Sequence, residues 1–240
     1  MTSEEPIGNL LDMSYEEFAK VSLPLYHGPM VKIKIGPTAY DVSKTLLCNR
    51  SPYFAGMFNG KFKEGQEHSA VLEEIEGVVS NRSFRLFLQW LYLGRVILGK
   101  ESPTDWISAM IEFARLADML SISNVESQII EHIRATILDN VPDVYSRDRL
   151  VHHMTPEHVY AATRLPKGHS VRRLLAQATI DTFLHSDTFK FSEEIREEPE
   201  FAADVLQELK VSLKSVKPES YVCIHFKEPL SGKEVVFNPH

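Results

Sequence analysis

Residues 31–65 read VKIKIGPTAYDVSKTLLCNRSPYFAGMFNGKFKEG, and this stretch decides the fold. Residues 31–35 alternate between β-branched apolar side chains and lysine, which is the pattern of a half-buried β-strand. The Gly-Pro pair at 36–37 predicts a turn. Residues 39–42 then predict a second strand, which we expect to pair with the first as a hairpin.

Helical spacing follows the hairpin. Apolar residues recur at helical intervals over residues 46–58, and Ser51-Pro52 interrupts them. This pair predicts the start of a second helix, because serine caps helix N-termini and proline suits the first helical position. Residues 71–75 predict a third short strand, residues 84–92 a further helix, and the residues after that helix a closing strand. Nothing in the stretch looks catalytic, so we interpret it as core and interface.

The same stretch resembles the BTB/POZ domain, a protein-interaction module. Residues 41–54 (DVSKTLLCNRSPYF) look like the family's strand-to-helix signature, and residues 57–64 (MFNGKFKE) match the segment that follows it. Residues 89–95 (QWLYLGR) are similar to the closing Tyr-Thr-Gly motif, in the form that is common in filamentous-fungal members. The resemblance covers roughly residues 30–138. It implies an α+β fold, with a small mixed sheet and a cluster of helices, and a role in binding other proteins.

Composition is that of a soluble globular protein. The chain has 240 residues, of which 43% are hydrophobic and 25% charged, so it is long enough to bury a sizeable core. A net charge of −7 argues against binding to nucleic acid or to an anionic membrane as the main role. Two cysteines, Cys48 and Cys223, are too few for a disulfide framework. With no secretory signal and no apolar run long enough to span a membrane, we expect an intracellular protein, cytoplasmic or nuclear or both.

The segments on either side of the central stretch are predicted to be helical. Before it, Ser14 and Glu17 form a capping box that starts a short helix ending near Lys20. After it, residues 103–120 and 123–137 carry apolar stripes at helical spacing. These two helices look like the closing helical hairpin of the BTB fold.

Residues 140–143 (NVPD) predict the end of the BTB/POZ region. Further helices are predicted from Pro156, from about Val171 and from Pro199, similar to the helical extensions of the family. In the tail, residues 221–237 contain two alternating β-branched and aromatic runs around a turn, which predict a hairpin, with a partly disordered tail as the alternative. The predicted domains are an N-terminal segment with a short helix (1–27), a BTB/POZ domain (28–139), a helical extension (140–215) and a C-terminal tail with a possible hairpin (216–240).

No motif for catalysis, phosphate binding or metal binding stands out. The sequence has neither the Gly-x-Ser-x-Gly elbow of hydrolases nor a glycine-rich phosphate-binding loop. His152, His153 and His158 lie close in sequence, but a helix start separates them and only Glu157 stands nearby. We therefore expect no metal site at these histidines.

Two charge clusters are interpreted as solvated surface. The basic residues Arg164, Lys167, Arg172 and Arg173 predict a solvated helix face rather than an RNA site. The acidic run over residues 193–200 predicts a solvated linker. We accordingly predict no catalytic residue, no cofactor and no small-molecule substrate.

One short motif does carry a functional prediction. Phe62-x-Glu64 matches the hydrophobic-x-Glu element with which BTB proteins that serve ubiquitin ligases contact the cullin scaffold. In physical terms, an apolar anchor fills a pocket of the cullin and a nearby acid orients it. Tyr53 is the third residue that we predict to bind cullin. In the alternative interpretation, Phe62 belongs to a satellite core and Glu64 is an ordinary loop carboxylate.

The resemblance also implies a dimer interface, for which we predict Lys44, Phe18 and Leu11. In animal members an N-terminal helix is exchanged between subunits; otherwise this helix simply covers one edge of its own core. Two departures weaken the inference of an exchanged dimer, because residues 28–30 (GPM) stand where the family has a conserved Asp, and Ser43 replaces the His of the His-Lys pair. Since an unpaired lysine in an apolar interface is costly, we expect Lys44 to reach solvent or to pair with an acid.

The sequence thus favours a non-catalytic protein that binds other proteins, and it leaves two functions open. The first is a substrate adaptor for a cullin-RING ubiquitin ligase, with the client held by residues 141–240. The second is a homo-oligomerising scaffold or transcription cofactor without ligase contact. An unrecognised enzyme would require a perturbed titratable cluster in a pocket, for which the sequence offers no candidate.

Overall fold

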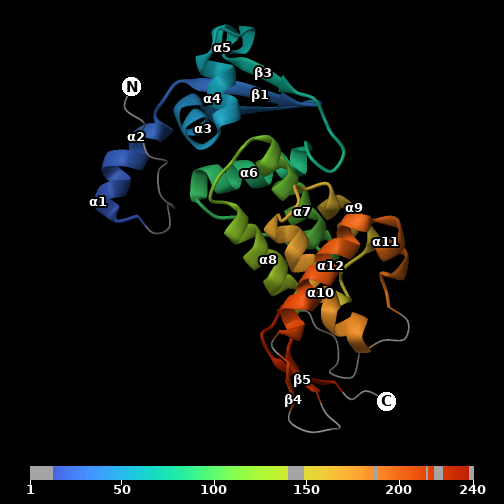
Figure 1. The fold of residues 1–240 in the computed structure, drawn as a ribbon. Helices are drawn as coiled ribbons and strands as arrows, with labels where there is room; N and C mark the ends of the chain where they lie inside the picture. The colour runs from blue at the N-terminus through green and yellow to red at the C-terminus, as the bar shows by residue number, and fades with distance from the viewer. Residues whose placement is uncertain (1–12, 140–148, 186–188, 215, 219–223, 238–240) are drawn as a thin grey trace. The chain divides into compact units, whose positions relative to one another are not determined.

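A computed structural model describes residues 13–139, 149–185, 189–214, 216–218 and 224–237 (Figure 1). The chain divides into two compact units. The first contains residues 1–99 and 112–128, and the second contains residues 100–111 and 129–240. The predicted domain boundary at 140–143 lies outside the described residues.

The sheet of the first unit has three strands, β1 (Met30–Ile35), β2 (Thr38–Ser43) and β3 (Ser69–Leu72), in the order β2-β1-β3. β2 is antiparallel to β1, with Ile35 opposite Thr38, as the hairpin prediction requires. β3 is parallel to β1, with Ile33 opposite Ala70. Apolar side chains at alternate positions of β1 are buried while the intervening lysines are exposed, so the small mixed sheet is confirmed.

Three helices follow from local sequence as predicted: α3 (Lys44–Arg50), α4 (Pro52–Asn59) and α6 (Asn81–Leu93). A further short helix, α5 (Lys63–Glu67), was not predicted. Ser51 caps α4, because its hydroxyl accepts the amide hydrogen of Phe54 at 3.3 Å. The same buried hydroxyl donates to the carbonyl oxygen of Leu120 at 2.8 Å. One serine therefore both starts α4 and ties it to the residue that directly follows helix α7 (Pro103–Met119).

The closing strand predicted after α6 is wrong. Gly94 ends the helix in the left-handed region at φ 68°, and the residues that follow it are irregular. The amide of Ile97 donates to the side-chain oxygen of Gln89 at 2.7 Å rather than to a neighbouring strand. Val96 is nevertheless buried. Val96 thus enters the core without forming a ladder, while Ile97 stays exposed.

The N-terminal helix begins at the predicted capping box but extends beyond its predicted end. It consists of α1 (Tyr15–Glu17), a π-helical turn η1 (Phe18–Ser22) and α2 (Leu23–Tyr26). The hydroxyl of Ser14 accepts the amide hydrogen of Glu17 at 3.2 Å, and the Glu17 carboxylate accepts the amide hydrogen of Ser14 at 3.1 Å. Pro24 has no amide hydrogen for a regular helical bond, which accounts for the wider turn just before it.

The core of the first unit is built around stacked aromatic rings from α4 and α6. The ring of Phe87 lies 6.1 Å from Phe54, 5.6 Å from Phe84 and 6.4 Å from Trp90, measured between centroids. Each of the four is almost fully buried. Aromatic pairs at this spacing add to the stabilisation that comes from buried area alone.

The second unit is helical apart from its C-terminal strands. It contains the first part of α7 (Pro103–Met119) and most of α8 (Glu126–Asp139), whose remaining residues belong to the first unit. Ile129, Ile133 and Ile137 of α8 are buried, which confirms the predicted stripe. The other helices of this unit are η2 (Arg149–Val151), α9 (Pro156–Thr163), α10 (Ser170–His185), α11 (Ser192–Glu197) and α12 (Pro199–Leu213).

The two charge clusters are solvated only in part: Arg164, Lys167 and Arg173 are exposed as predicted, whereas other members are buried. The acidic run contains α11, whose Glu194 is buried, so it is not a linker. Arg172 is also buried, and its guanidinium donates to Asp204 at 2.7 Å and to Glu200 at 2.9 Å. Arg173 pairs with Glu208 at 3.1 Å. These ion pairs join α10 to α12, which lie side by side in Figure 1.

The tail forms the predicted hairpin and one further strand. β5 (Ile224–Lys227) and β6 (Glu234–Phe237) are antiparallel, and the short β4 (Lys217–Pro218) pairs with β5. The buried carboxylate of Glu228 closes the turn by accepting the amide hydrogens of Leu230 and Ser231. Phe226 and Leu230 are buried, so part of the hairpin is packed.

Candidate partner-binding surface

Phe62 is the most exposed phenylalanine of the described chain. Its side chain follows α4 and stands at the N-cap of α5, where 62% of the residue is exposed, compared with 38% for Phe18 and 36% for Phe183. The neighbouring phenylalanines of this unit are buried, so an exposed aromatic ring here is unusual. Phe62 is therefore not a member of a satellite core.

The Phe62 ring rests on Gly60. A Cβ atom on Gly60 would lie 2.9 Å from Cδ2 of Phe62 and 2.6 Å from the carbonyl oxygen of Gly56. Both distances are shorter than real Cβ contacts, although the backbone of Gly60 itself is in a region that any residue adopts. The absence of a side chain at Gly60 thus provides the space in which the aromatic ring is seated.

The corner between α4 and α5 is tightly closed. A Cβ atom on Gly65 would lie 2.9 Å from the carbonyl oxygen of Phe58, which shows how closely the two helices approach. The amide of Gly65 donates to the carbonyl of Phe62 at 3.2 Å. From α3, the ammonium of Lys44 donates to the carbonyl of Phe58 at 2.9 Å. These contacts hold the backbone that presents Phe62 in a defined conformation.

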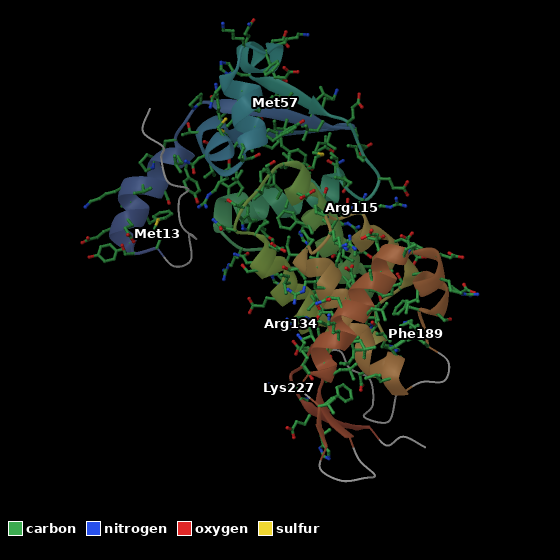
Figure 2. All side chains as sticks on the ribbon, viewed as in Figure 1. Met13, Met57, Arg115, Arg134, Phe189 and Lys227 are labelled. Carbon is green, nitrogen blue, oxygen red and sulfur yellow. The ribbon has the colours of Figure 1, made fainter. Side chains whose placement is uncertain are left out.

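Tyr53 lies at the opposite end of α4 from Phe62. Helix rise places these two ends about 10 Å apart. Tyr53 is 38% exposed, and its ring packs edge-on against Phe54 with 5.3 Å between centroids. Met57, labelled in Figure 2, lies on α4 between them and is half-buried. Tyr53 is thus braced by the aromatic core, and Tyr53 and Phe62 flank α4.

Glu64 is half-buried in the first turn of α5, where a carboxylate is favoured by the helix dipole. Close to it, Lys63 and Glu67 form an ion pair at 3.6 Å, with both side chains mostly exposed. Such a surface pair contributes little to stability. The polar surroundings of Phe62 therefore contain both signs of charge.

Of the three predicted dimer residues, Leu11 lies outside the described residues. Phe18 is partly exposed, with its ring 6.2 Å from that of Tyr26. The hydroxyl of Tyr26 donates to the carbonyl of Tyr92 at 2.7 Å, which anchors the end of the N-terminal helix on α6. Lys44 differs from both alternatives set out above, because it is half-buried and bound to a backbone carbonyl rather than to solvent or an acid. The unpaired carbonyls at the end of a helix are natural acceptors for an ammonium.

Local contacts occupy both positions at which the sequence departs from the family pattern. A Cβ atom on Gly28 would lie 2.1 Å from Oγ1 of Thr45, so a larger residue there requires the Thr45 side chain to move. The hydroxyl of Ser43 donates to the carbonyl of Leu25 at 2.5 Å and accepts the amide hydrogen of Leu46 at 3.4 Å. Ser43 therefore caps α3 and ties it to α2.

His158 is engaged in structural hydrogen bonds. Its Nδ1 accepts the amide hydrogen of Thr155 at 3.1 Å, which leaves the proton on Nε2, 2.7 Å from Oγ of Ser108. Burial lowers the pKa of His158 to about 4. The rings of His152 and His153 touch at 4.7 Å between centroids. Among the residues with described positions, no group of three or more His, Cys, Asp or Glu side chains is suited to hold a metal ion.

The seat beneath Phe62 is the feature that sequence reasoning missed. The only local signal is the pair of glycines, Gly56 and Gly60, four residues apart at the end of α4. Glycine is unfavourable within a helix, so a pair at this spacing suggests close approach of another group. The motif Phe62-x-Glu64 identified the ring but gave no information about its support.

Comparison with protein families assigns the central part of the chain. The model of the BTB/POZ domain matches residues 30–137, which include the sheet, the α4–α5 corner and all of the predicted cullin-binding residues. BTB domains are interaction modules and are generally non-enzymatic. In the part of the chain with described structure, no helix has both the length and the apolar character to cross a membrane. Residues 30–137 are thus similar to the BTB/POZ domain, and protein–protein interaction is the role of that domain.

Proposed function

We propose that this protein is a substrate adaptor for a cullin-RING ubiquitin ligase and that Phe62 is its principal cullin anchor. The single observation that carries the proposal is the 62% exposure of Phe62 within the matched BTB/POZ domain. An aromatic side chain held in place by its own backbone loses little freedom on binding. Burying the exposed part of such a ring in a partner's pocket contributes about 1.5–3 kcal/mol.

Tyr53 and Glu64 extend the proposed contact on either side of the anchor. Tyr53 offers a partly exposed ring with a hydroxyl at its edge, a combination that is common at interfaces. Glu64 supplies a carboxylate from a short helix next to the anchor. The proposed contact therefore has an apolar centre and a polar rim, as stable interfaces do.

In this proposal the rest of the chain acts by binding. The helical extension, residues 140–215, holds the client, while the BTB/POZ domain holds the ligase. The protein carries out no chemistry itself and needs no cofactor. Its place of action is the cytoplasm, the nucleus or both.

The proposal is tested by calorimetric titration of the full chain with the N-terminal domain of the BTB-binding cullin. We expect a dissociation constant of about 1 µM or tighter, and a loss of at least about tenfold, which is 1.4 kcal/mol, for Phe62→Ala. Leu93→Ala is the matched control, because Leu93 is 51% exposed but lies at the end of α6. Both variants should unfold within about 0.5 kcal/mol of wild type, since neither side chain is buried.

Two results would contradict the adaptor function. Wild-type protein that does not bind the cullin domain removes it altogether. Equal losses for Phe62→Ala and Leu93→Ala would show that the contact does not use the α4–α5 corner. Loss of binding by Phe62→Ala alone, with unchanged unfolding, supports the anchor.

A homo-oligomerising scaffold or transcription cofactor is the second candidate, and the N-terminal helix favours it. Tyr15 is 84% exposed, Val21 46% and Leu23 41%, so this helix exposes several apolar side chains to solvent. A second copy would cover such side chains. In this case sedimentation gives a dimer that Phe18→Glu dissociates, and Phe62→Ala changes nothing.

A further inference from the structure

Helix α12 presents an apolar stripe beside its buried face. Phe201, Val205, Glu208 and Ser212 are buried in the second unit. About a third of a turn around the helix from them, Leu206 is 60% exposed and Leu213 is 59% exposed. These two leucines account for a large part of the exposed apolar surface of the helix.

The stripe has the spacing of a helix-pairing seam. Ala202, Leu206, Leu209 and Leu213 are separated by four, three and four residues, which is the alternation of a and d positions in a heptad. Ala202 and Leu209 are half-buried, and the two leucines seven residues apart stand out from the surface. A seam of this kind accepts side chains from a second helix as knobs into holes.

The charges that border the stripe have a single sign. From Leu206 to Lys214 the exposed charged residues are Lys210 and Lys214. Glu208 is the one carboxylate in that range, and its oxygens accept from Arg173 at 3.1 Å and from Gln177 at 2.9 Å in the interior. A positive border is notable in a chain whose net charge is −7.

We propose that the stripe Leu206–Leu209–Leu213 is a docking surface for an acidic amphipathic helix of a partner protein. Leucines of the partner fill the holes between Leu206 and Leu213, and its carboxylates meet Lys210 and Lys214. A second copy of α12 fits less well, because an antiparallel pairing brings Lys210 near its own symmetry mate. The proposal does not depend on the cullin contact, since it uses no residue of the α4–α5 corner.

The test uses synthetic helical peptides of about three heptads with leucine at a and d. One peptide has glutamate at e and g, and its matched partner has lysine there. Full-length protein is titrated with each labelled peptide by fluorescence anisotropy. Leu206→Glu combined with Leu213→Glu is the test variant, and Val211→Glu is the control, because Val211 is 44% exposed on a different side of α12.

We expect the acidic peptide to bind wild type, Val211→Glu and Phe62→Ala alike, and to bind the double variant at least about tenfold more weakly. The basic peptide should not bind. Circular dichroism should show that the exposed substitutions leave the fold intact.

Three results would overturn the proposal. The first is the same affinity of wild type for both peptides, which indicates unspecific apolar contact. The second is an acidic peptide that fails to bind wild type or binds the double variant equally well. The third is a wild-type dimer, seen by sedimentation, that the double variant dissociates. That result assigns the stripe to a second copy of this chain.

Discussion

Acidification should weaken the second unit through one buried histidine. His158 is 2% exposed, and burial is the largest cause that lowers its pKa from 6.5 to about 4. Above pH 6.5 the imidazole is neutral in the folded and in the unfolded chain, so it makes stability neither rise nor fall with pH. Below pH 6.5 the His158 imidazole binds a proton in the unfolded chain but stays neutral in the folded chain. The free energy of unfolding must therefore fall as the pH drops from 6.5 towards 4.

The expected size follows from the two pKa values. The full shift corresponds to about 3 kcal/mol, of which about 2 kcal/mol is lost by pH 5. Protonation also has a geometric consequence, because Nδ1 of His158 accepts the amide hydrogen of Thr155. A protonated Nδ1 would place two donors against each other and break the cap of α9.

Urea unfolding at about pH 7.5 and about pH 5, followed by tryptophan fluorescence, measures this loss. His158→Gln should be less stable than wild type at the higher pH, and the difference should shrink by about 2 kcal/mol at the lower pH. His152→Gln is the matched control, because His152 is exposed, and it should follow wild type at both values. A stability difference between wild type and His158→Gln that is the same at both pH values would refute the argument.

Two further predictions concern the α4–α5 corner and the ion pairs of the extension. Gly60→Ala should weaken cullin binding about as much as Phe62→Ala does, because the added Cβ occupies the space in which the Phe62 ring lies. Gly56→Ala should not displace the ring, since nothing lies within 4 Å of the Cβ position at Gly56. Titration of both variants with the cullin domain compares them. Arg172→Met should cost on the order of 3 kcal/mol of unfolding free energy, because Asp204 is left buried without its partner. Arg196→Met, at an exposed ion pair, should stay within about 0.5 kcal/mol of wild type in the same urea experiment.

The parts of the fold that could be predicted from sequence are those in which the signal is local. In β1, alternation of Ile33 and Ile35 with lysines reports directly which side of the strand is buried. The start of α4 was predictable for the same reason, since Ser51 and Pro52 act on the first turn of the helix that they begin. Neither inference needed to know what the element packs against.

The parts that failed depend on residues far along the chain. Arg172 looks like a surface cation until Asp204, more than thirty residues later, is brought beside it by the pairing of α10 with α12. The closing strand failed because the amide of Ile97, which a strand would pair with a neighbouring backbone carbonyl, donates to the side chain of Gln89, eight residues earlier in α6. Pattern alone cannot distinguish these outcomes.

The sequence predicted the residues of the candidate site but not how those residues are held in space. The pair Phe62 and Glu64 came from resemblance to a family segment, and the structure adds that the ring is exposed. That Gly60 supports it follows only from distances across the α4–α5 corner. The stripe on α12 was also visible in the sequence as apolar residues, but which of them face solvent depends on the packing of α10.

The mixed sheet has a consequence for the order in which the first unit assembles. β1 and β2 are joined by a two-residue turn, so their hairpin closes within microseconds without help from the rest of the chain. The parallel pairing of β1 with β3 has to enclose α3, α4 and α5, and the entropy of closing that loop delays it. The corner that presents Phe62 is part of the enclosed segment. Phe62 therefore acquires its final position only when β3 docks, and a chain stalled before that step would have its hairpin but not the closed α4–α5 corner.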